Sequence, residues 1–532
     1  MAMCRDRTEC GSFSNRLRNG GFPKHMENSK KSFKIITFGI LSQIVTLLLG
    51  IIIPRLVIVS YGSEVNGLLS SIRQIFVYVA LLEAGIGTAA LQAMYAPIAS
   101  NDQIRASKIM AATDRYFKRT GILYGIVVIL LALIYPIVVR IELSYWTVVA
   151  IILLQGSSGV IKYFFQGKLT ILLRVDGKSY ITTNTTTVVN VATHAVQIVL
   201  LLSGFDVIAV QSIYFIINLA QMIYLTRYVK KHYAWLNLRE TPDYASLKQS
   251  KYVIVHQISG LIFNNTDAIL LTAFCDLKVV SVYSLYSMIF SCVANVIDTV
   301  CSSVEFILGQ AFNSDRKRFL QLQEVYETYY LGISFAFFTI TLLLFPSFIQ
   351  LYTRGITDIN YVDPWLPYLF AGLYIMMYAR RTSSQVINFA GHFQQTQWRS
   401  VLESAINLTV SIFLVSKIGI YGVLLGTIAA LLYRTNDIII YTNRKILNRS
   451  PWKTYRRWGV NMGLMIALVW WLSHYISEMD SYLVWAATAI WVTAICMITF
   501  FLIDSIFDRA SFCFLISRIK SLIQSRRRQI RP

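Results

Sequence analysis

The chain has 532 residues, of which 55% are hydrophobic and 14% are charged, and its mean hydropathy is +0.54. A soluble domain is typically about 45–50% apolar and about 25% charged, so this composition argues against an ordinary water-soluble fold. The formal net charge of +22 does not indicate nucleic-acid binding, because the basic residues form short clusters between apolar runs, as in membrane proteins.

The beginning of the chain is polar, basic and without periodicity. Residues 1–34 are therefore expected to form a disordered cytoplasmic arm. The first apolar run is too long for the hydrophobic region of a signal peptide, so no signal peptide is predicted. A cleaner start at Met26 makes this methionine our hypothesis for the natural initiator.

The rest of the chain contains fourteen segments that are long and apolar enough to cross a bilayer as helices, which takes about 20 residues. Their apolar runs are continuous rather than alternating, which favours helices over a closed barrel. The expected fold is an all-α integral membrane protein. The predicted spans are 35–59, 67–95, 116–139, 143–165, 180–202, 207–229, 251–274, 279–308, 328–352, 365–389, 399–416, 420–442, 458–476 and 483–504.

The loops between these spans differ in charge. Most of the 49 lysines and arginines fall in the two termini and in every second loop. The intervening loops hold only Arg140, Lys278, Arg354 and Lys417. By the positive-inside rule, both termini are expected in the cytoplasm of a multi-pass protein of the cell membrane, most simply a bacterial inner membrane.

The first and seventh spans align at an offset of 214 residues. Ser70 then meets Ser284, and Ile75-Phe76 meets Ile289-Phe290. We expect two six-helix bundles, related as a parallel pseudo-repeat, with two helices appended. The expected organisation is an N-terminal bundle 35–229, a cytoplasmic linker 230–250, a C-terminal bundle 251–442, two further helices 443–504 and a basic cytoplasmic tail 505–532.

Several short motifs are similar to those of a known family. Residues 54–56, 61–67 and 83–89 carry three of them, and the polar run Phe263-Asn264-Asn265-Thr266-Asp267 carries another. The remaining motifs lie at 390–393, 403–408, 419–423 and 426–427. From residue 30 to residue 445 the chain resembles the polysaccharide-transporter branch, of the O-antigen-flippase type, of the multidrug/oligosaccharidyl-lipid/polysaccharide (MOP) flippase superfamily.

The resemblance implies a V-shaped pair of bundles around a central cavity. It also implies transport of an isoprenoid-pyrophosphate-linked oligosaccharide from the cytoplasmic to the outer leaflet by alternating access. The expected partners are this lipid-linked substrate, anionic inner-leaflet lipids at the basic tail and polysaccharide assembly proteins. Two alternatives stay open: a small-molecule or drug exporter of the same superfamily, and a membrane-embedded glycan polymerase or ligase.

Arginines inside the spans are candidates for substrate binding, because a charge at the bilayer centre costs at least about 2.5–3.5 kcal/mol. A guanidinium binds phosphate oxygens in a bidentate manner, so these side chains predict a cationic cavity. Snorkelling to headgroups or structural ion pairs with Glu403 or Asp298 are the alternatives. The four candidates are Arg55, Arg73, Arg380 and Arg381.

Four acidic residues in the spans are candidates for coupling to H⁺ or Na⁺, or for ion pairing. Asp267 follows a run that is unusually polar for a span, and interhelical hydrogen bonding is the alternative reading. No cofactor or metal site is expected, because the cysteines and histidines show no ligand spacing. The four acidic candidates are Glu83, Asp267, Asp298 and Glu403.

Overall fold

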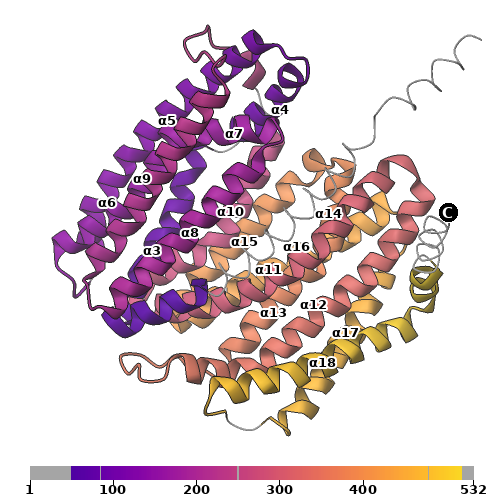
Figure 1. The fold of residues 1–532 in the computed structure, drawn as a ribbon. Coiled ribbons are helices and arrows are strands. Elements are labelled where there is room, and N and C mark those ends of the chain that lie inside the picture. Colours follow the sequence, from indigo (N-terminus) through magenta and orange to yellow (C-terminus); the bar gives the residue numbers. More distant parts are fainter. Residues whose placement is uncertain (1–48, 84–85, 140, 248–250, 477–478, 518–532) are drawn as a thin grey trace, which may run out of the picture.

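The structure is a computed structural model that describes residues 49–83, 86–139, 141–247, 251–476 and 479–517. Every regular element in these ranges is a helix, and Figure 1 shows the earlier helices grouped beside the later ones. The predicted arm 1–34, the Met26 hypothesis, Arg140 and the last part of the tail lie outside the described residues.

The first half of the described chain forms ten labelled elements after an unlabelled apolar helix, Leu49–Tyr61. They are α3 (Ser63–Val79), η1 (Ala80–Glu83), α4 (Ile86–Ala99), α5 (Gln103–Val138), α6 (Tyr145–Ile161), the π-helix η2 (Lys162–Gln166), α7 (Gly167–Val175), α8 (Ser179–Leu202), α9 (Val207–His232) and η3 (Ala245–Leu247).

The second half continues with ten further elements. They are α10 (Lys251–Phe274), α11 (Leu277–Ser314), α12 (Arg316–Tyr352), α13 (Leu366–Ala379), α14 (Arg381–Ala390), α15 (Phe393–Ile418), α16 (Ile420–Tyr441), the π-helix η4 (Thr442–Ile446), α17 (Trp452–Ser473) and α18 (Tyr482–Phe507).

The described helices lie where the spans were predicted. Helix α10 has the predicted bounds, and α3 and α11 begin at Ser63 and Leu277, which are 214 positions apart as in the proposed repeat. Among the described residues, nine helices are long and apolar enough to cross a membrane. The all-α membrane fold is therefore confirmed, whereas the total of fourteen spans stays a prediction.

Three predicted spans are not single helices. The span 67–95 is interrupted after η1, 365–389 is interrupted at Arg380, and 143–165 continues through η2 to Val175. A π-helix is a rare element that appears mostly as a single-turn bulge between stretches of α-helix, as η2 does between α6 and α7. Here Gly167 follows η2 and lies so close to the Phe117 ring that a Cβ atom would be 2.6 Å from it.

Short polar residues set the helix starts at the turns. The side chain of Asp102 accepts a hydrogen bond from the Arg105 amide at 2.9 Å, which caps α5. Asp206 and Asp315 cap α9 and α12 in the same way. Because the first amides of a helix lack intrahelical acceptors, such carboxylates stabilise the helix start, and this explains why these helices begin there.

We call α3–α9 the N-terminal lobe and α10–α16 the C-terminal lobe. One buried apolar cluster lies in the N-terminal lobe and the segment that follows α9, and it includes Ile109, Leu172 and Leu225. A second belongs to the C-terminal lobe and the α17–α18 hairpin, with Ile58 of the first helix added. Each lobe therefore has a core of its own.

A third buried cluster contains residues of both lobes, and we call it the joint. It brings Leu68 of α3 together with Leu271 of α10 and Val280 of α11. Its members lie near the turns at 61–63, 139–145, 203–206, 275–277 and 417–420. These turns belong to the loops that the charge distribution assigns to the outer side, so the lobes share a core at that end.

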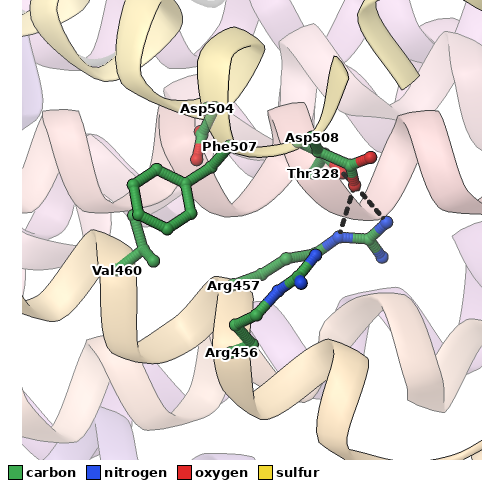
Figure 2. Close-up of a pocket in the computed structure, with 7 residues that line it drawn as sticks. All are labelled: Thr328, Arg456, Arg457, Val460, Asp504, Phe507 and Asp508. Atoms are coloured by element: carbon green, nitrogen blue, oxygen red, sulfur yellow. Dashed lines mark hydrogen bonds and ion pairs between the residues drawn. The ribbon is translucent and has the colours of Figure 1, made fainter. Parts of the chain in front are cut away.

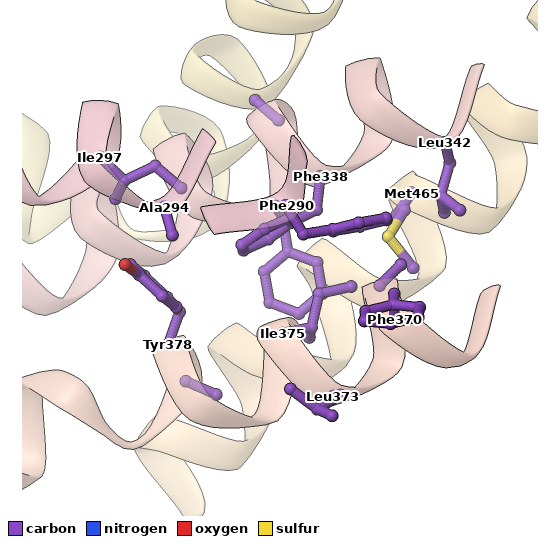
Figure 3. Close-up of a cluster of buried hydrophobic side chains, with 14 of the residues drawn as sticks. Phe290, Ala294, Ile297, Phe338, Leu342, Phe370, Leu373, Ile375, Tyr378 and Met465 are labelled. Carbon is purple, nitrogen blue, oxygen red and sulfur yellow. The ribbon is translucent and has the colours of Figure 1, made fainter. Parts of the chain in front are cut away.

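The core of the C-terminal lobe is rich in aromatic rings (Figure 3). The ring of Phe290 on α11 lies 5.6 Å from that of Phe370 on α13 and 6.5 Å from that of Phe338 on α12, measured between centroids. Met465 of α17 reaches the same cluster. Aromatic contacts of this kind pack three helices of the lobe and connect the hairpin to them.

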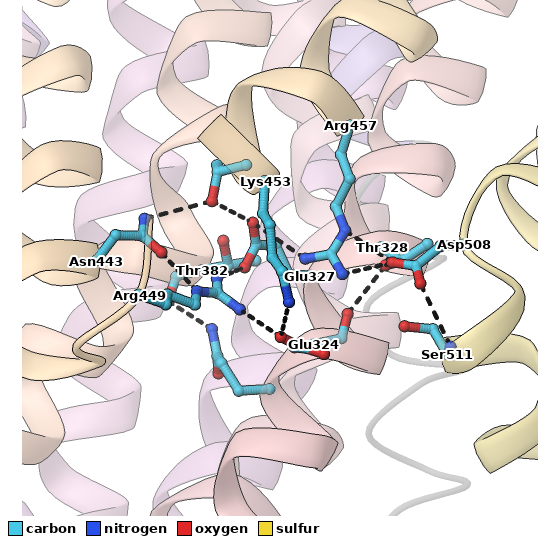
Figure 4. A network of polar contacts seen from close by, with 12 residues as sticks. Glu324, Glu327, Thr328, Thr382, Asn443, Arg449, Lys453, Arg457, Asp508 and Ser511 are labelled. Atoms are coloured by element: carbon cyan, nitrogen blue, oxygen red, sulfur yellow. Dashed lines mark hydrogen bonds and ion pairs between the residues drawn. The ribbon is translucent and has the colours of Figure 1, made fainter. Parts of the chain in front are cut away.

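The α17–α18 hairpin is also held to α12 by buried charges (Figure 4). Glu327 of α12 is fully buried, accepts a hydrogen bond from the Thr454 hydroxyl at 2.5 Å and pairs with Arg449. Arg457 of α17 pairs with Asp508 at 2.5 Å. Buried charges need such partners, so this network sets how the hairpin docks.

The joint allows a test of packing at Gly67 of α3. A Cβ atom there would lie 1.8 Å from the carbonyl oxygen of Leu277. We expect Gly67→Ala to destabilise the protein by about 1–3 kcal/mol, as overpacking does, and to lower the thermal-unfolding midpoint in detergent. Gly372→Ala is the control, because a Cβ atom there meets nothing within 4 Å. Equal midpoints for the two variants would contradict the close approach.

Candidate functional site

Arg55 contacts the C-terminal end of α12. One of its terminal nitrogens donates to the carbonyl of Leu351 at 2.8 Å and to that of Tyr352. The same nitrogen lies 2.9 Å from the hydroxyl of Tyr482 on α18. Because the last carbonyls of a helix lack intrahelical donors and carry partial negative charge, Arg55 stabilises this helix end. In this conformation it connects three helices.

Arg73 has a different environment. It lies seven residues after Asn66, about two turns along the same face of α3. Arg73 is an exposed residue. It interacts electrostatically with His194 of α8 and Tyr214 of α9. Among the residues that the structure describes, none forms an ion pair or hydrogen bond with its guanidinium.

Helix α8 has a polar face next to Arg73. Thr183, Thr186, Asn190 and His194 follow one another at spacings of three and four residues, so they share one side of the helix. Both threonines are exposed. The other side of α8 is apolar and exposed, for example at Val188. A span of this kind turns its apolar side to lipid, so its polar side lines the protein interior.

A buried charge network connects α13, α15 and α16. Glu403 pairs with Arg380 at 2.5 Å and with Arg434 at 3.4 Å. Arg434 also pairs with Asp437 at 2.7 Å, and Asp437 pairs with Arg399 at 2.5 Å. The two carboxylates therefore hold three arginines and leave one net positive charge. For Arg380 this geometry is the ion pair with Glu403 that was the alternative to substrate binding.

Arg381 points toward α11. Its guanidinium lies 3.5 Å from Asp298 and 3.5 Å from Glu305. The side chains of Arg381 and Asp298 are 39% and 35% exposed, so this pair is accessible, in contrast to that of Arg380. The helix break at Arg380 lets two adjacent arginines reach different helices.

Asp267 of α10 is buried among hydroxyl groups. Tyr283 donates to its carboxylate at 3.0 Å, and the Thr427 hydroxyl lies 3.1 Å from it. Asn407 donates to the same threonine at 2.8 Å, and its own side-chain oxygen has no donor among the described residues. No cationic side chain of the described chain pairs with Asp267. Such a set of oxygens can hold a proton or a hard monovalent cation.

Glu83, at the end of η1, faces η2 of the same lobe. Its carboxylate lies 3.9 Å from the ammonium group of Lys162. This pair is distant in sequence from the C-terminal network and from Asp267. The structure therefore divides the eight predicted residues among six separate places, and it does not gather the four arginines in one cluster.

The part of the C-terminal network formed by Arg434 and Asp437 was not predicted from the sequence. Arg434 and Asp437 lie inside the predicted span 420–442, three residues apart, which is the spacing of an intrahelical ion pair. That spacing was the available signal. Within the described residues, no three His, Cys, Asp or Glu side chains are grouped so that they could hold a metal ion.

The network at Glu403 predicts unequal costs for two neutralising substitutions. Glu403→Gln leaves Arg380 without a carboxylate among the described residues, while Arg434 keeps Asp437, and removing one partner of a buried pair costs about 3–5 kcal/mol. Asp298→Asn is the control, since Arg381 keeps Glu305 and partly exposed pairs contribute about 0–1 kcal/mol. We expect a much larger fall in the thermal-unfolding midpoint for Glu403→Gln, partly recovered by adding Arg380→Met.

Equal midpoints for Glu403→Gln and Asp298→Asn would contradict the assignment of a structural role to Glu403. A loss of stability that Arg380→Met makes larger would contradict the pairing of these two side chains.

No protein-family model and no curated protein matches the chain. Solved structures do match. The lipid II flippase MurJ, in its inward closed conformation, aligns with a TM-score of 0.63 and 13% identity, covering 89% of this chain and 99% of that chain. An inward-facing multidrug resistance MATE family transporter of the MOP superfamily aligns with a TM-score of 0.59 and 14% identity, covering 76% of this chain and 98% of that chain.

The MATE multidrug transporter DinF-BH aligns with a TM-score of 0.55 and 12% identity, over 77% of this chain and 95% of that chain. At identities this low, the structural similarity shows the fold and leaves the substrate open. The chain therefore shares its helical fold with a lipid II flippase and with multidrug transporters.

Proposed function

We propose that this protein is a flippase that moves an isoprenoid-pyrophosphate-linked oligosaccharide from the cytoplasmic to the outer leaflet for surface polysaccharide biosynthesis. The observation that carries the proposal is Arg73, an exposed guanidinium within the bundle that has no ion-pair partner among the described residues. An unpaired cation at this depth is costly, and an anionic substrate offsets that cost while it is bound. The fold shared with a lipid II flippase supports a lipid-linked substrate.

The polar face of α8 supports the proposal that the substrate carries a glycan. Thr183, Thr186 and Asn190 offer hydroxyl and amide groups, which donate and accept hydrogen bonds as sugar hydroxyls do. Arg73 lies beside this face, so a diphosphate held by the guanidinium would bring the attached glycan against α8. Arg381 is the second proposed phosphate contact, because its side chain is 39% exposed whereas that of Arg380 is 16% exposed.

Alternating access requires the joint to open. At that end Asn66 donates to the Ser281 hydroxyl at 2.7 Å, and Ser281 lies 2.7 Å from the hydroxyl of Tyr361. Tyr361 in turn contacts Ser63 at 2.6 Å. These contacts link the lobes through the 353–365 segment, and they involve hydroxyl and amide groups that can exchange partners with water. In the proposed cycle they break when the outer side opens.

The proposed location is a bacterial inner membrane, with both termini in the cytoplasm and the joint at the outer side. The asymmetry of basic loops supports this orientation. The basic tail is proposed to contact anionic lipids of the inner leaflet, and polysaccharide assembly proteins are the proposed protein partners.

Two alternatives fit the described residues less well. An exporter of organic cations needs an accessible carboxylate without a cationic partner, but Glu83, Glu403 and Asp298 pair with cationic side chains and Asp267 is 4% exposed. A glycan polymerase or ligase needs catalytic residues on an outer loop. In the 353–365 segment, Asp358 accepts hydrogen bonds from Ser63, and Asp363 accepts from the Trp365 and Leu366 amides at the start of α13, so both carboxylates have structural roles.

Asp267 is the proposed coupling residue. Its carboxylate is buried, its described partners are hydroxyl donors, and the unpaired Asn407 oxygen belongs to the same group of side chains. Binding of H⁺ or Na⁺ would neutralise the carboxylate and so favour one arrangement of α10, α15 and α16. Transport is thereby linked to an ion gradient.

Arg73→Gln tests the substrate site. In proteoliposomes of the full-length protein, we expect it to slow the flipping of a fluorescent polyprenyl-pyrophosphoryl-N-acetylglucosamine by roughly tenfold or more, because a hydrogen bond to a charged group contributes about 1.5–3 kcal/mol. Dithionite quenching of the outer-leaflet probe measures the rate. Arg354→Gln is the control, since the hydrogen bond of this loop arginine within the described part of the chain goes to the Asp480 carbonyl, at 3.5 Å. Wild-type flipping by Arg73→Gln would refute the proposal.

Asp267→Asn tests the coupling. We expect flipping by this variant to lose its response to an imposed pH or Na⁺ gradient, because an amide is neutral and has no negative charge for H⁺ or Na⁺ to neutralise. Asp298→Asn serves as the comparison, since Asp298 is an accessible carboxylate already paired with an arginine. An undiminished gradient response in Asp267→Asn would exclude this residue as the coupling site.

A further inference from the structure

Asp504 of α18 is a buried carboxylate outside the proposed transport site. It is 3% exposed and packs between α12 and α17. Asn461 of α17, 1% exposed, donates from its amide nitrogen to Oδ1 of Asp504 at 3.0 Å. In Figure 2 Asp504 extends from α18 beside a cavity of about 10 Å³, apart from the ion pair of Arg457 with Asp508.

Two hydrogen-bond acceptors in this place have no donor among the described residues. They are Oδ2 of Asp504 and Oδ1 of Asn461, and both are buried. Both atoms lie near Gly332 of α12. A Cβ atom on Gly332 would lie 2.0 Å from Oδ2 of Asp504 and 3.9 Å from Oδ1 of Asn461. Two buried acceptors repel each other unless a hydrogen atom or a cation lies between them.

The charged groups around Asp504 are already matched without it (Figure 4). Arg457 pairs with Asp508 at 2.5 Å and lies 3.4 Å from Glu327. The other pairs of the same network are Arg449 with Glu327, Arg449 with Glu324 at 3.5 Å, and Lys453 with Glu324 at 3.0 Å.

Within this network three cations therefore face three carboxylates before Asp504 is counted. Arg456 also lines the cavity, but it is exposed and forms no ion pair with a described carboxylate, so solvent screens its charge. From α12, Tyr329 also faces this region, and its hydroxyl lies 3.1 Å from that of Ser505. An ionised Asp504 would be the fourth carboxylate, an unbalanced charge in a segment long and apolar enough to cross a membrane. Burial of such a charge is unfavourable, so a neutral Asp504 is favoured.

We propose that Asp504 is a proton-binding site in the α17–α18 hairpin. The protonated Oδ2 donates to Oδ1 of Asn461, while the amide nitrogen of Asn461 donates to Oδ1 of Asp504. This ring of two hydrogen bonds satisfies both acceptors and leaves the network with equal numbers of positive and negative charges. The bound species is the proton alone, and no covalent bond of the carbon skeleton changes.

A metal cation fits the same place poorly. Hard cations such as Na⁺ take several oxygen ligands, whereas the described residues offer two unpartnered oxygens here. The guanidinium of Arg457 also lies close enough to interact electrostatically with Asp504, and it opposes a second positive ion. Gly332 leaves room for the carboxyl group itself, not for a hydrated ion.

Infrared spectroscopy of the full-length protein in liposomes tests the proposal directly. A protonated carboxyl has a C=O stretching band above the amide I band, and this band shifts in D₂O. We expect the difference spectrum of wild type minus Asp504→Asn, recorded at neutral pH, to contain this band in NaCl and in choline chloride alike. Asp508→Asn is the matched control one turn away, and it should remove a carboxylate band instead, because Asp508 is paired with Arg457.

A carboxylate band in the wild type minus Asp504→Asn spectrum would overturn the proposal. An acid band that is present only in choline chloride would do so too, since Na⁺ would then occupy the site. Because an amide at position 504 can make the same two hydrogen bonds, Asp504→Asn is expected to fold and to match the wild-type thermal midpoint. Should it not fold, Asn461→Leu gives a second readout: loss of the acceptor is expected to raise the frequency of the acid band, and an unchanged band would overturn the pairing.

Discussion

The cost of a charge in a low-dielectric environment governs this structure. Glu403 lies between two arginines, and Glu327 holds the hairpin through Arg457. At Arg55 helix carbonyls take the place of a carboxylate. Against this background Arg73 is informative. The described residues give it no ion-pair partner, and the face of α8 next to it is polar. A charge kept in such a place indicates a ligand rather than a role in stability.

The shared core at one end of the molecule gives the two lobes a common pivot. Apolar residues of α3, α10 and α11 meet there, and Gly67 lets α3 approach the backbone of α11 closely. Elsewhere each lobe has its own buried cluster, so a change at the joint need not disturb either core. A rigid-body movement between the lobes requires such separate cores, because each lobe must keep its own packing while the joint changes.

Sequence patterns predicted the features that depend on local chemistry. Apolar runs located the helices, and the offset of 214 residues matched the starts at Ser63 and Leu277. The pairing of Arg380 with Glu403 was among the alternatives because the cost of an unpaired charge is general. The pairing of Arg399 with Asp437 and the contact of Asn461 with Asp504 were not predicted. Both depend on the rotation of one helix against another, which no local pattern encodes.

The central claim is that the joint must open for each transport cycle. Asn66→Cys with Ser281→Cys, in a variant without the native cysteines, places two thiols where the side chains now form a hydrogen bond of 2.7 Å. The decisive measurement is the rate of flipping of the fluorescent pyrophosphate-linked probe in proteoliposomes before and after oxidation. We expect cross-linking to stop flipping and a reductant to restore it. Flipping at the uncross-linked rate in fully cross-linked protein would contradict it.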